Sequence, residues 1–171
     1  MISYREMERD DLLKALEMFA KSWLAHDGCW FLAAEEKLGM AAAIELDAAS
    51  WARFAAHEAH RIMTTFNIPH GGGLASLEQA LNLRMYSLIN AQHTEWSEDR
   101  QKLRMFMDVC RVQETRRRKG LPDFPCKSVG TVEYSTFART IDSRIETACL
   151  HCPPDADKNQ YCGWEFSMAE A

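Results

Sequence analysis

The chain has 171 residues, of which 47% are hydrophobic and 26% charged, and its formal net charge is −5. This composition is typical of one soluble globular domain covering residues 1–171, and no apolar run approaches the ~18 residues of a membrane span. The N-terminal residues MISYREMERDDLLK lack the apolar stretch of a signal peptide, so we expect a cytoplasmic protein. In that reducing compartment, the six cysteines are expected to be buried thiols, metal ligands or reactive groups rather than disulfides.

Charge is distributed unevenly along the chain. Residues 1–100 carry nine Lys and Arg against 15 Asp and Glu, whereas residues 101–171 carry 11 against ten. One run, Arg116 to Lys119, supplies much of the positive charge of the second part. No aromatic residues are interleaved with it and the chain is acidic overall, so we expect no nucleic-acid binding. A solvated turn, or an anion clamp at the mouth of a pocket, is the plainer interpretation.

Residues 1–81 are expected to be mainly helical. Leu12, Leu16, Phe19 and Trp23 recur at helical spacing and predict one apolar helix face, in a helix that ends near His26-Asp27-Gly28. Glycine and proline mark the later boundaries. The other helices expected here are Trp30 to Gly39, a short Ala41–Leu46 segment, a long helix from Asp47 or Ser50 to Phe66, and 74–81.

The pattern changes after residue 82. Apolar and polar side chains alternate over 83–90 and 103–110, which predicts a first β-hairpin. A helix over 128–141 and strands over 144–151 and 160–168 are expected to follow. This order predicts an α+β fold, in which N-terminal helices pack on an antiparallel sheet of about four strands, built from two hairpins separated by a helix.

Four cysteines are spaced as candidate metal ligands. Cys149 and Cys152 form a C-x-x-C pair, Cys162 returns on the next strand, and Cys126 follows a Phe-Pro turn. Four thiolates suit tetrahedral zinc, and an iron–sulfur cluster would use the same ligands. His151 or Cys110 are alternative fourth ligands. Buried or redox-active thiols without a metal are the other interpretation.

Further residues are candidates for catalysis or ligand binding. His57-Glu58-Ala59-His60 is one residue short of the H-E-x-x-H zinc-protease motif, but a buried Glu58 would be suited to acid–base chemistry. Cys110 is adjacent to Arg111, which would lower the pKa of the thiol and make it nucleophilic. Arg111, Trp30 and Glu36 are candidate ligand- or anion-binding residues. Two surface histidines beside a surface Glu58, a buried Cys110 thiol beside a surface arginine, and a charged helix rim are the plainer alternatives.

Short motifs over nearly the whole chain carry a family resemblance. The most specific is the ending Cys152-Pro153-Pro154-Asp155 with Tyr161–Phe166. The chain resembles a family of uncharacterised cytosolic proteins, a domain of unknown function found mainly in anaerobic bacteria and archaea. The other motifs that carry the resemblance are Asp27–Ala33, Glu35-Glu36-Lys37, Trp51, Glu58, Arg61, Cys110-Arg111, Lys119–Pro122, Phe124-Pro125-Cys126 and Glu133-Tyr134.

More distantly, the layout is similar to 2-amino-thiazoline-4-carboxylate hydrolase-like proteins and to vinyl-reductase-type ligand-binding domains. Those resemblances imply a sheet covered by helices with a small-molecule pocket between them. Our first hypothesis is a small-molecule binding or sensor domain with a cysteine-ligated metal. The alternative is a hydrolase of a C–N or C–S bond, in which the metal or Cys110 activates the attack and Glu58 moves protons. A homodimer through apolar helix faces is also possible, and no membrane contact is expected.

Overall fold

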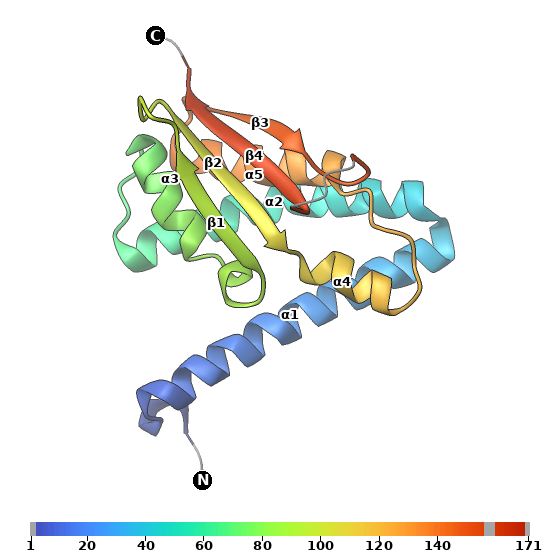
Figure 1. Cartoon of the computed structure of the whole chain (residues 1–171). Coiled ribbons are helices and arrows are strands. Elements are labelled where there is room, and N and C mark those ends of the chain that lie inside the picture. Colours follow the sequence, from blue (N-terminus) through green and yellow to red (C-terminus); the bar gives the residue numbers. More distant parts are fainter. Residues whose placement is uncertain (1–2, 156–159, 170–171) are drawn as a thin grey trace.

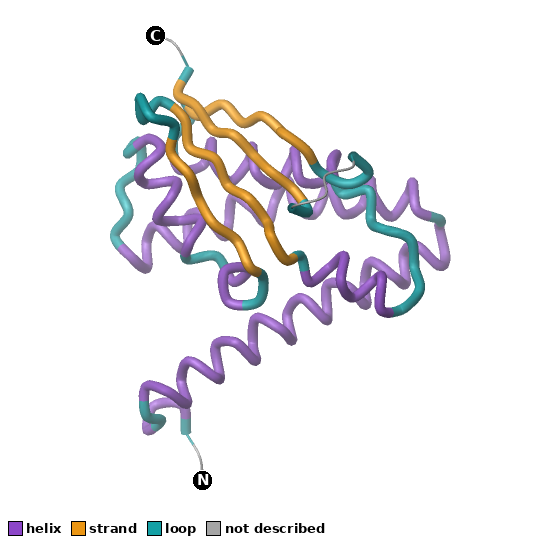
Figure 2. The backbone as a smooth tube through the Cα atoms, in the orientation of Figure 1, coloured by secondary structure: helices purple, strands orange, loops and turns teal. Residues whose placement is uncertain are grey.

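The computed structural model describes residues 3–155 and 160–169 as one four-stranded sheet with helices packed against it (Figures 1 and 2). Helices α2, α3 and α5 lie behind the sheet in these views, and the long helix α1 extends beyond its edge. The elements are the short 3-10 helices η1 (Tyr4–Glu6) and η2 (Met85–Leu88), the helices α1 (Arg9–Leu38), α2 (Met40–Phe66), α3 (Gly73–Asn82), α4 (Arg111–Arg118) and α5 (Lys127–Ile141), and the strands β1 (Ala91–Trp96), β2 (Lys102–Val109), β3 (Ile145–His151) and β4 (Cys162–Met168).

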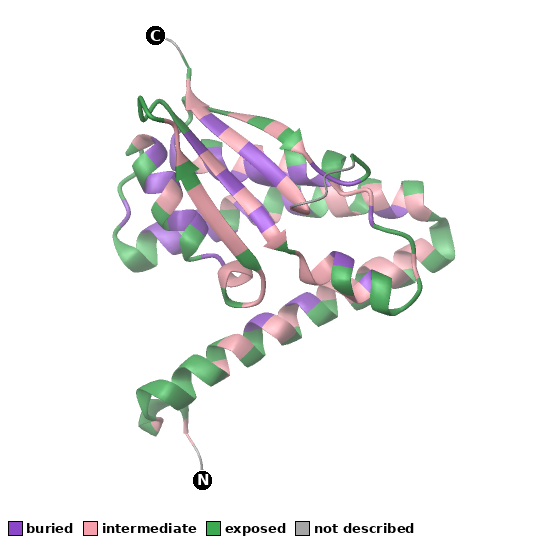
Figure 3. Cartoon of the chain, viewed as in Figure 1, coloured by how far each residue is buried: buried purple, intermediate pink, exposed green. Residues whose placement is uncertain are grey.

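The sheet order is β1-β2-β4-β3, and all neighbouring strands are antiparallel. Side chains alternate between its two faces. Leu103, Met105 and Met107 of β2 are buried with Trp164 and Phe166 of β4, and they line the helix-facing side of the sheet. These strands therefore present one apolar face to the helices, as the bands of buried residues in Figure 3 show.

Helices α2 and α5 pack closely because small side chains lie between larger ones. Ala55 and Ala59 of α2 and Phe137 of α5 are completely buried. At Gly130 of α5, an added Cβ would lie 2.7 Å from Cζ2 of Trp164. The glycine therefore lets the indole ring of β4 lie directly against the backbone of α5.

The predicted α+β class, the second hairpin and the helix near 128–141 are confirmed, and a first hairpin is present with its first strand displaced from the predicted position. Two helix boundaries were wrong. Helix α1 continues through Gly28 to Leu38, because packing of Leu24 and Phe31 on either side outweighs the ~1 kcal/mol cost of a helical glycine. The real break is Gly39, whose φ of 83° ends α1, and α2 then runs unbroken from Met40 through the predicted start at Asp47 or Ser50.

The first predicted strand was also wrong. Residues 85–88 form the 3-10 helix η2, and the first strand is Ala91–Trp96. The alternation was misleading because Arg84 is buried in an ion pair rather than facing solvent on a strand. The basic run, predicted to be a turn or an anion clamp, lies largely in helix α4. The hairpins are thus separated by two helices, α4 and α5.

Candidate functional site

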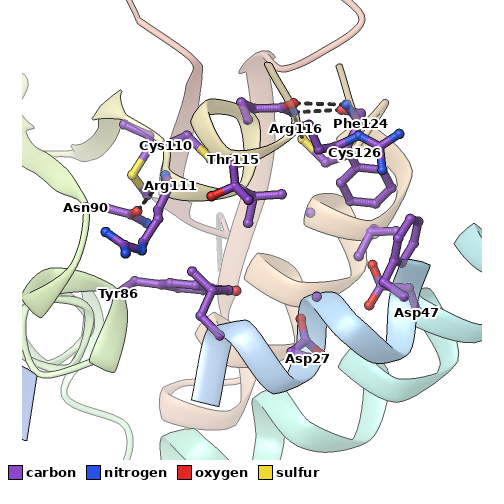
Figure 4. A pocket seen from close by; sticks show the side chains of 18 of the residues that line it. Asp27, Asp47, Tyr86, Asn90, Cys110, Arg111, Thr115, Arg116, Phe124 and Cys126 are labelled. Carbon is purple, nitrogen blue, oxygen red and sulfur yellow. Dashed lines mark hydrogen bonds between the residues drawn. The ribbon is translucent and has the colours of Figure 1, made fainter. Parts of the chain in front are cut away.

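A cavity of about 360 Å³ lies where α1, α2, α4 and α5 meet the ends of β2 and β4 (Figure 4). Most of its lining is apolar. Carboxyl, thiol and guanidinium groups interrupt that lining from several elements, which is the usual construction of a small-molecule site. The polar and thiol residues of the lining include Asp27, Asp47, Glu133, Cys110, Cys126, Cys152, Cys162 and Arg111.

Helix α4 is tied to the rest of the cavity wall by hydrogen bonds from side chains. Arg116 donates from Nη1 and Nη2 to the two carboxylate oxygens of Glu35 on α1, at 2.8 and 3.1 Å. Its Nε donates to the carbonyl of Pro122 at 2.7 Å. At the start of α4, the backbone N–H of Arg111 donates to Asn90 Oδ1 at 2.9 Å. Arg116 is therefore a structural clasp rather than a free anion-binding group.

Gln113 holds the segment that carries Cys126. Its side chain accepts from the backbone N–H of Phe124 at 2.9 Å and donates to the carbonyl of the same residue at 2.8 Å. Gln113 is 1% exposed, so these bonds are well shielded from water. Phe124 also packs edge-on against Phe31 of α1. The turn before Cys126 is thus fixed on both sides.

Two aspartates from adjacent helices, Asp27 of α1 and Asp47 of α2, turn into the cavity opposite Tyr86 (Figure 4). Burial raises the pKa of Asp27. The pKa of Asp47 rises to about 7, because it is buried and because Asp27 and Glu133 are negative neighbours. Within residues 3–155 and 160–169, no ion pair joins either aspartate to a basic side chain. The pair therefore presents uncompensated acidity to the cavity.

A second acidic group lies deeper and is compensated. Arg84 Nη2 contacts Glu58 Oε2 at 2.8 Å and Glu133 Oε1 at 2.6 Å, and all three side chains are buried. The guanidinium also lies over the rings of Trp51 and Tyr86. Burial alone would lower the pKa of Arg84, but the two glutamates raise it. Arg84 thus remains charged between its partners.

The structure brings three of the four predicted metal ligands to the lining of the cavity. The Sγ atoms of Cys126 and Cys152 are 3.3 Å apart, and Cys162 lines the same wall. Cys149 is half-buried and pairs in register with Trp164, one strand away. In the described part of the chain, no group of three or more His, Cys, Asp or Glu side chains is already placed to hold a metal ion. Zinc ligation, like an iron–sulfur cluster, stays a prediction.

The two predicted catalytic residues, Cys110 and Glu58, do not lie together in the cavity. Cys110 lines the cavity, but burial raises the pKa of its thiol to about 12, with smaller contributions from neighbouring thiols. The expected lowering by Arg111 was wrong, because desolvation dominates at this position. Glu58 is buried, which the catalytic hypothesis required and the plainer alternative of a surface glutamate did not. Arg84 holds its carboxylate, however, and Glu58 is not among the residues lining the cavity.

The predicted ligand-binding residues are also distributed. Arg111 lines the cavity, whereas Trp30 is 70% exposed beside a second hollow between α1 and α2. Glu36 is exposed, and its neighbour Glu35 makes the inward contact. The sequence interpretation missed Asp47 as a site residue. Its position one turn before the buried Trp51 was the available signal.

None of the helices among the described residues is long and apolar enough to cross a membrane.

Comparisons with known proteins place the fold. No curated protein matches the sequence. A crystal structure of a trafficking protein particle complex subunit 3 from Naegleria fowleri, covalently bound to palmitic acid, is similar over 95% of this chain and 98% of that chain. Its TM-score is 0.50 and its sequence identity 11%, so the likeness concerns the fold alone. The family model that matches residues 5–168 is described as a family of unknown function, DUF6125, and the chain belongs to this family.

Proposed function

We propose that this protein binds a small organic molecule in the cavity between its helices and its sheet, as a cytoplasmic binding or sensor domain. The observation that carries the proposal is a cavity of about 360 Å³, with an apolar lining and acidic groups facing into it. That volume is within the usual range for ligand pockets. The trafficking subunit of similar fold covalently holds palmitic acid, which supports an apolar ligand in such a fold.

The acidic pair indicates the class of ligand. In their ionised forms Asp27 and Asp47 would repel a carboxylate, and burial together with their proximity raises the free energy of those ionised forms in the empty cavity. A cationic amine would relieve that repulsion and could stack on Tyr86, which lines the cavity opposite the two aspartates. We therefore assign the cavity to a compact molecule with an apolar body and a basic group.

Three probes of similar shape test this assignment. Isothermal titration calorimetry with 2-phenylethylamine is expected to show saturable binding, at least tenfold tighter than with 2-phenylethanol or 3-phenylpropionate. The Asp47→Asn variant is expected to lose that preference. Glu146→Gln removes a charge from an exposed position on β3 and should retain it. Equal affinity for the three probes, or preference for the carboxylate, would overturn the assignment to amines.

We further propose that Cys126, Cys149, Cys152 and Cys162 bind one zinc ion at the end of this cavity. Two sulfurs on a tetrahedral zinc lie about 3.8 Å apart, given Zn–S bonds of ~2.3 Å. The 3.3 Å between Cys126 and Cys152 is close to that spacing. Such a site would be closed by four protein ligands, and it would brace the last hairpin against the start of α5.

Elemental analysis of protein purified without chelator tests the zinc site. One zinc per chain is expected, and Cys152→Ser should lose it together with several degrees of thermal stability. Cys29→Ser is the matched control, because Cys29 is exposed on α1. Absence of zinc with all thiols titrating freely would contradict the proposal. Stoichiometric iron with visible charge-transfer absorption would replace zinc by an iron–sulfur cluster.

A further inference from the structure

The N-terminal half of α1 carries an apolar face that the described chain leaves largely exposed, although the ring of Tyr4 lies 5.6 Å from that of Phe19. Leu12, Leu13, Leu16 and Phe19 are all exposed, and no residue from Arg9 to Phe19 is buried. This half of the helix projects away from the sheet and the other helices (Figures 1 and 3). A projecting helix of this length, about 16 Å for 11 residues, gains little stability alone in water. An uncovered apolar stripe of this kind marks an interaction surface.

The exposed stripe is continuous with a face that is already packed. Helical spacing places Leu12, Leu16 and Phe19 in line with Trp23, which packs on Trp51 and Phe54 of α2. The same face of α1 is therefore covered by the protein's own core after residue 20 and uncovered before it. A partner that covers the exposed part of this face must therefore pack against a narrow helical surface rich in leucine.

The charges beside the stripe fit a second copy of the same helix. From Arg5 to Lys21 the chain has four Lys and Arg and five Asp and Glu, so two copies would not strongly repel each other. The charges are also ordered: Asp10 and Asp11 lie at the N-terminal end, whereas Lys21 lies towards the middle of the helix. Within each helix Asp11 pairs with Lys14 and Lys21 pairs with Glu17, all on exposed side chains. Antiparallel pairing about Leu16 would add contacts between the acidic end of each helix and Lys21 of the other.

We propose that the chain forms a two-fold symmetric homodimer through antiparallel pairing of residues 9–21 of α1. Two-fold contacts join the same patch on both copies, so a self-complementary stripe is the surface they require. Leu16 lies next to the symmetry axis, and the exposed Leu13 of each copy faces the exposed Phe19 of the other. The dimer would cover eight large apolar side chains, four from each copy. This inference does not depend on the ligand cavity or on zinc.

Light scattering after size exclusion tests the dimer directly. The full chain is expected to elute at twice its mass of 19.6 kDa. Leu16→Glu, at a position 51% exposed, should give the monomer mass with unchanged far-ultraviolet circular dichroism. Leu38→Glu, at the other end of the same helix and 60% exposed, should remain dimeric. A monomeric wild-type chain, including one that binds lipid vesicles as a monomer, would overturn the proposal.

Cysteine crosslinking tests the antiparallel arrangement. In a Cys29→Ser background, Leu16→Cys is expected to form a disulfide-linked dimer rapidly under mild oxidation, because the two copies meet at that position. Leu12→Cys should crosslink at least tenfold more slowly. Equal and rapid crosslinking at both positions would indicate parallel helices and overturn the antiparallel pairing. A Leu16→Cys protein that stays uncrosslinked would overturn the pairing about Leu16.

Discussion

Two pairs of acidic residues near the cavity differ in burial and in their partners: Glu58 and Glu133 are buried, whereas Asp27 and Asp47 are only half-buried. Glu58 and Glu133 share the guanidinium of Arg84, whereas Asp27 and Asp47 face the cavity without a basic partner among the described residues. A buried charge with a good partner is part of the architecture, and one without a partner raises the energy of the empty site. Arg84 therefore compensates the buried pair, whereas a cationic ligand, under the proposed function, would compensate Asp27 and Asp47.

The largest expected effect on stability comes from removing Arg84, the shared partner of Glu58 and Glu133. Arg84→Met leaves two buried carboxylates uncompensated, so we expect the free energy of unfolding at pH 7 to fall by about 3–5 kcal/mol in urea denaturation. Arg53→Met removes an exposed arginine from α2 and should change it by less than about 0.5 kcal/mol. Adding Glu58→Gln and Glu133→Gln to Arg84→Met should restore part of the loss. If Arg84→Met lowered the free energy of unfolding by less than about 1 kcal/mol, Arg84 would not be needed to compensate the charges of the two glutamates.

From the raised pKa of Asp47 we expect a pH dependence of the free energy of unfolding, of intermediate size. The pKa of Asp47 is about 7 in the folded chain and about 4 when unfolded, so the folded state binds the extra proton between these values. Stability is therefore expected to fall as pH rises from 5 to 7, by about 1–3 kcal/mol, and to level off above pH 7. Asp47→Asn should remove most of this slope. Parallel stability curves for the variant and the wild type would contradict the raised pKa.

The smallest expected effect is that of the Asp27 charge on the pKa of Asp47. Asp27→Asn removes one of the negative neighbours that raise the pKa of Asp47. The pH dependence assigned to Asp47 should then shift to lower pH by less than about one unit, which is under about 1.4 kcal/mol. Carboxyl carbon chemical shifts in an NMR titration would measure it. An unchanged midpoint would show that burial, and not Asp27, sets the pKa.

The comparison also explains what could be predicted from the sequence. Strands β2, β3 and β4 and helix α5 were predictable because their apolar residues alternate or repeat with one clear period. The 83–90 segment was not, since its alternation includes Arg84, whose burial depends on glutamates 26 residues before and 49 residues after it. The cysteine set could be proposed from spacing alone. For Asp47 the sequence offered only its position one turn before Trp51, because its place beside Asp27 depends on the packing of α1 on α2.

The contact between Gly130 and Trp164 has a consequence for the dimensions of the cavity. With 2.7 Å between an added Cβ at residue 130 and the indole ring, no other residue fits here unless the helix moves. Both residues line the cavity. The absence of a side chain at position 130 therefore lets α5 lie close to β4. That distance would in turn limit the size of the molecule that the cavity could hold.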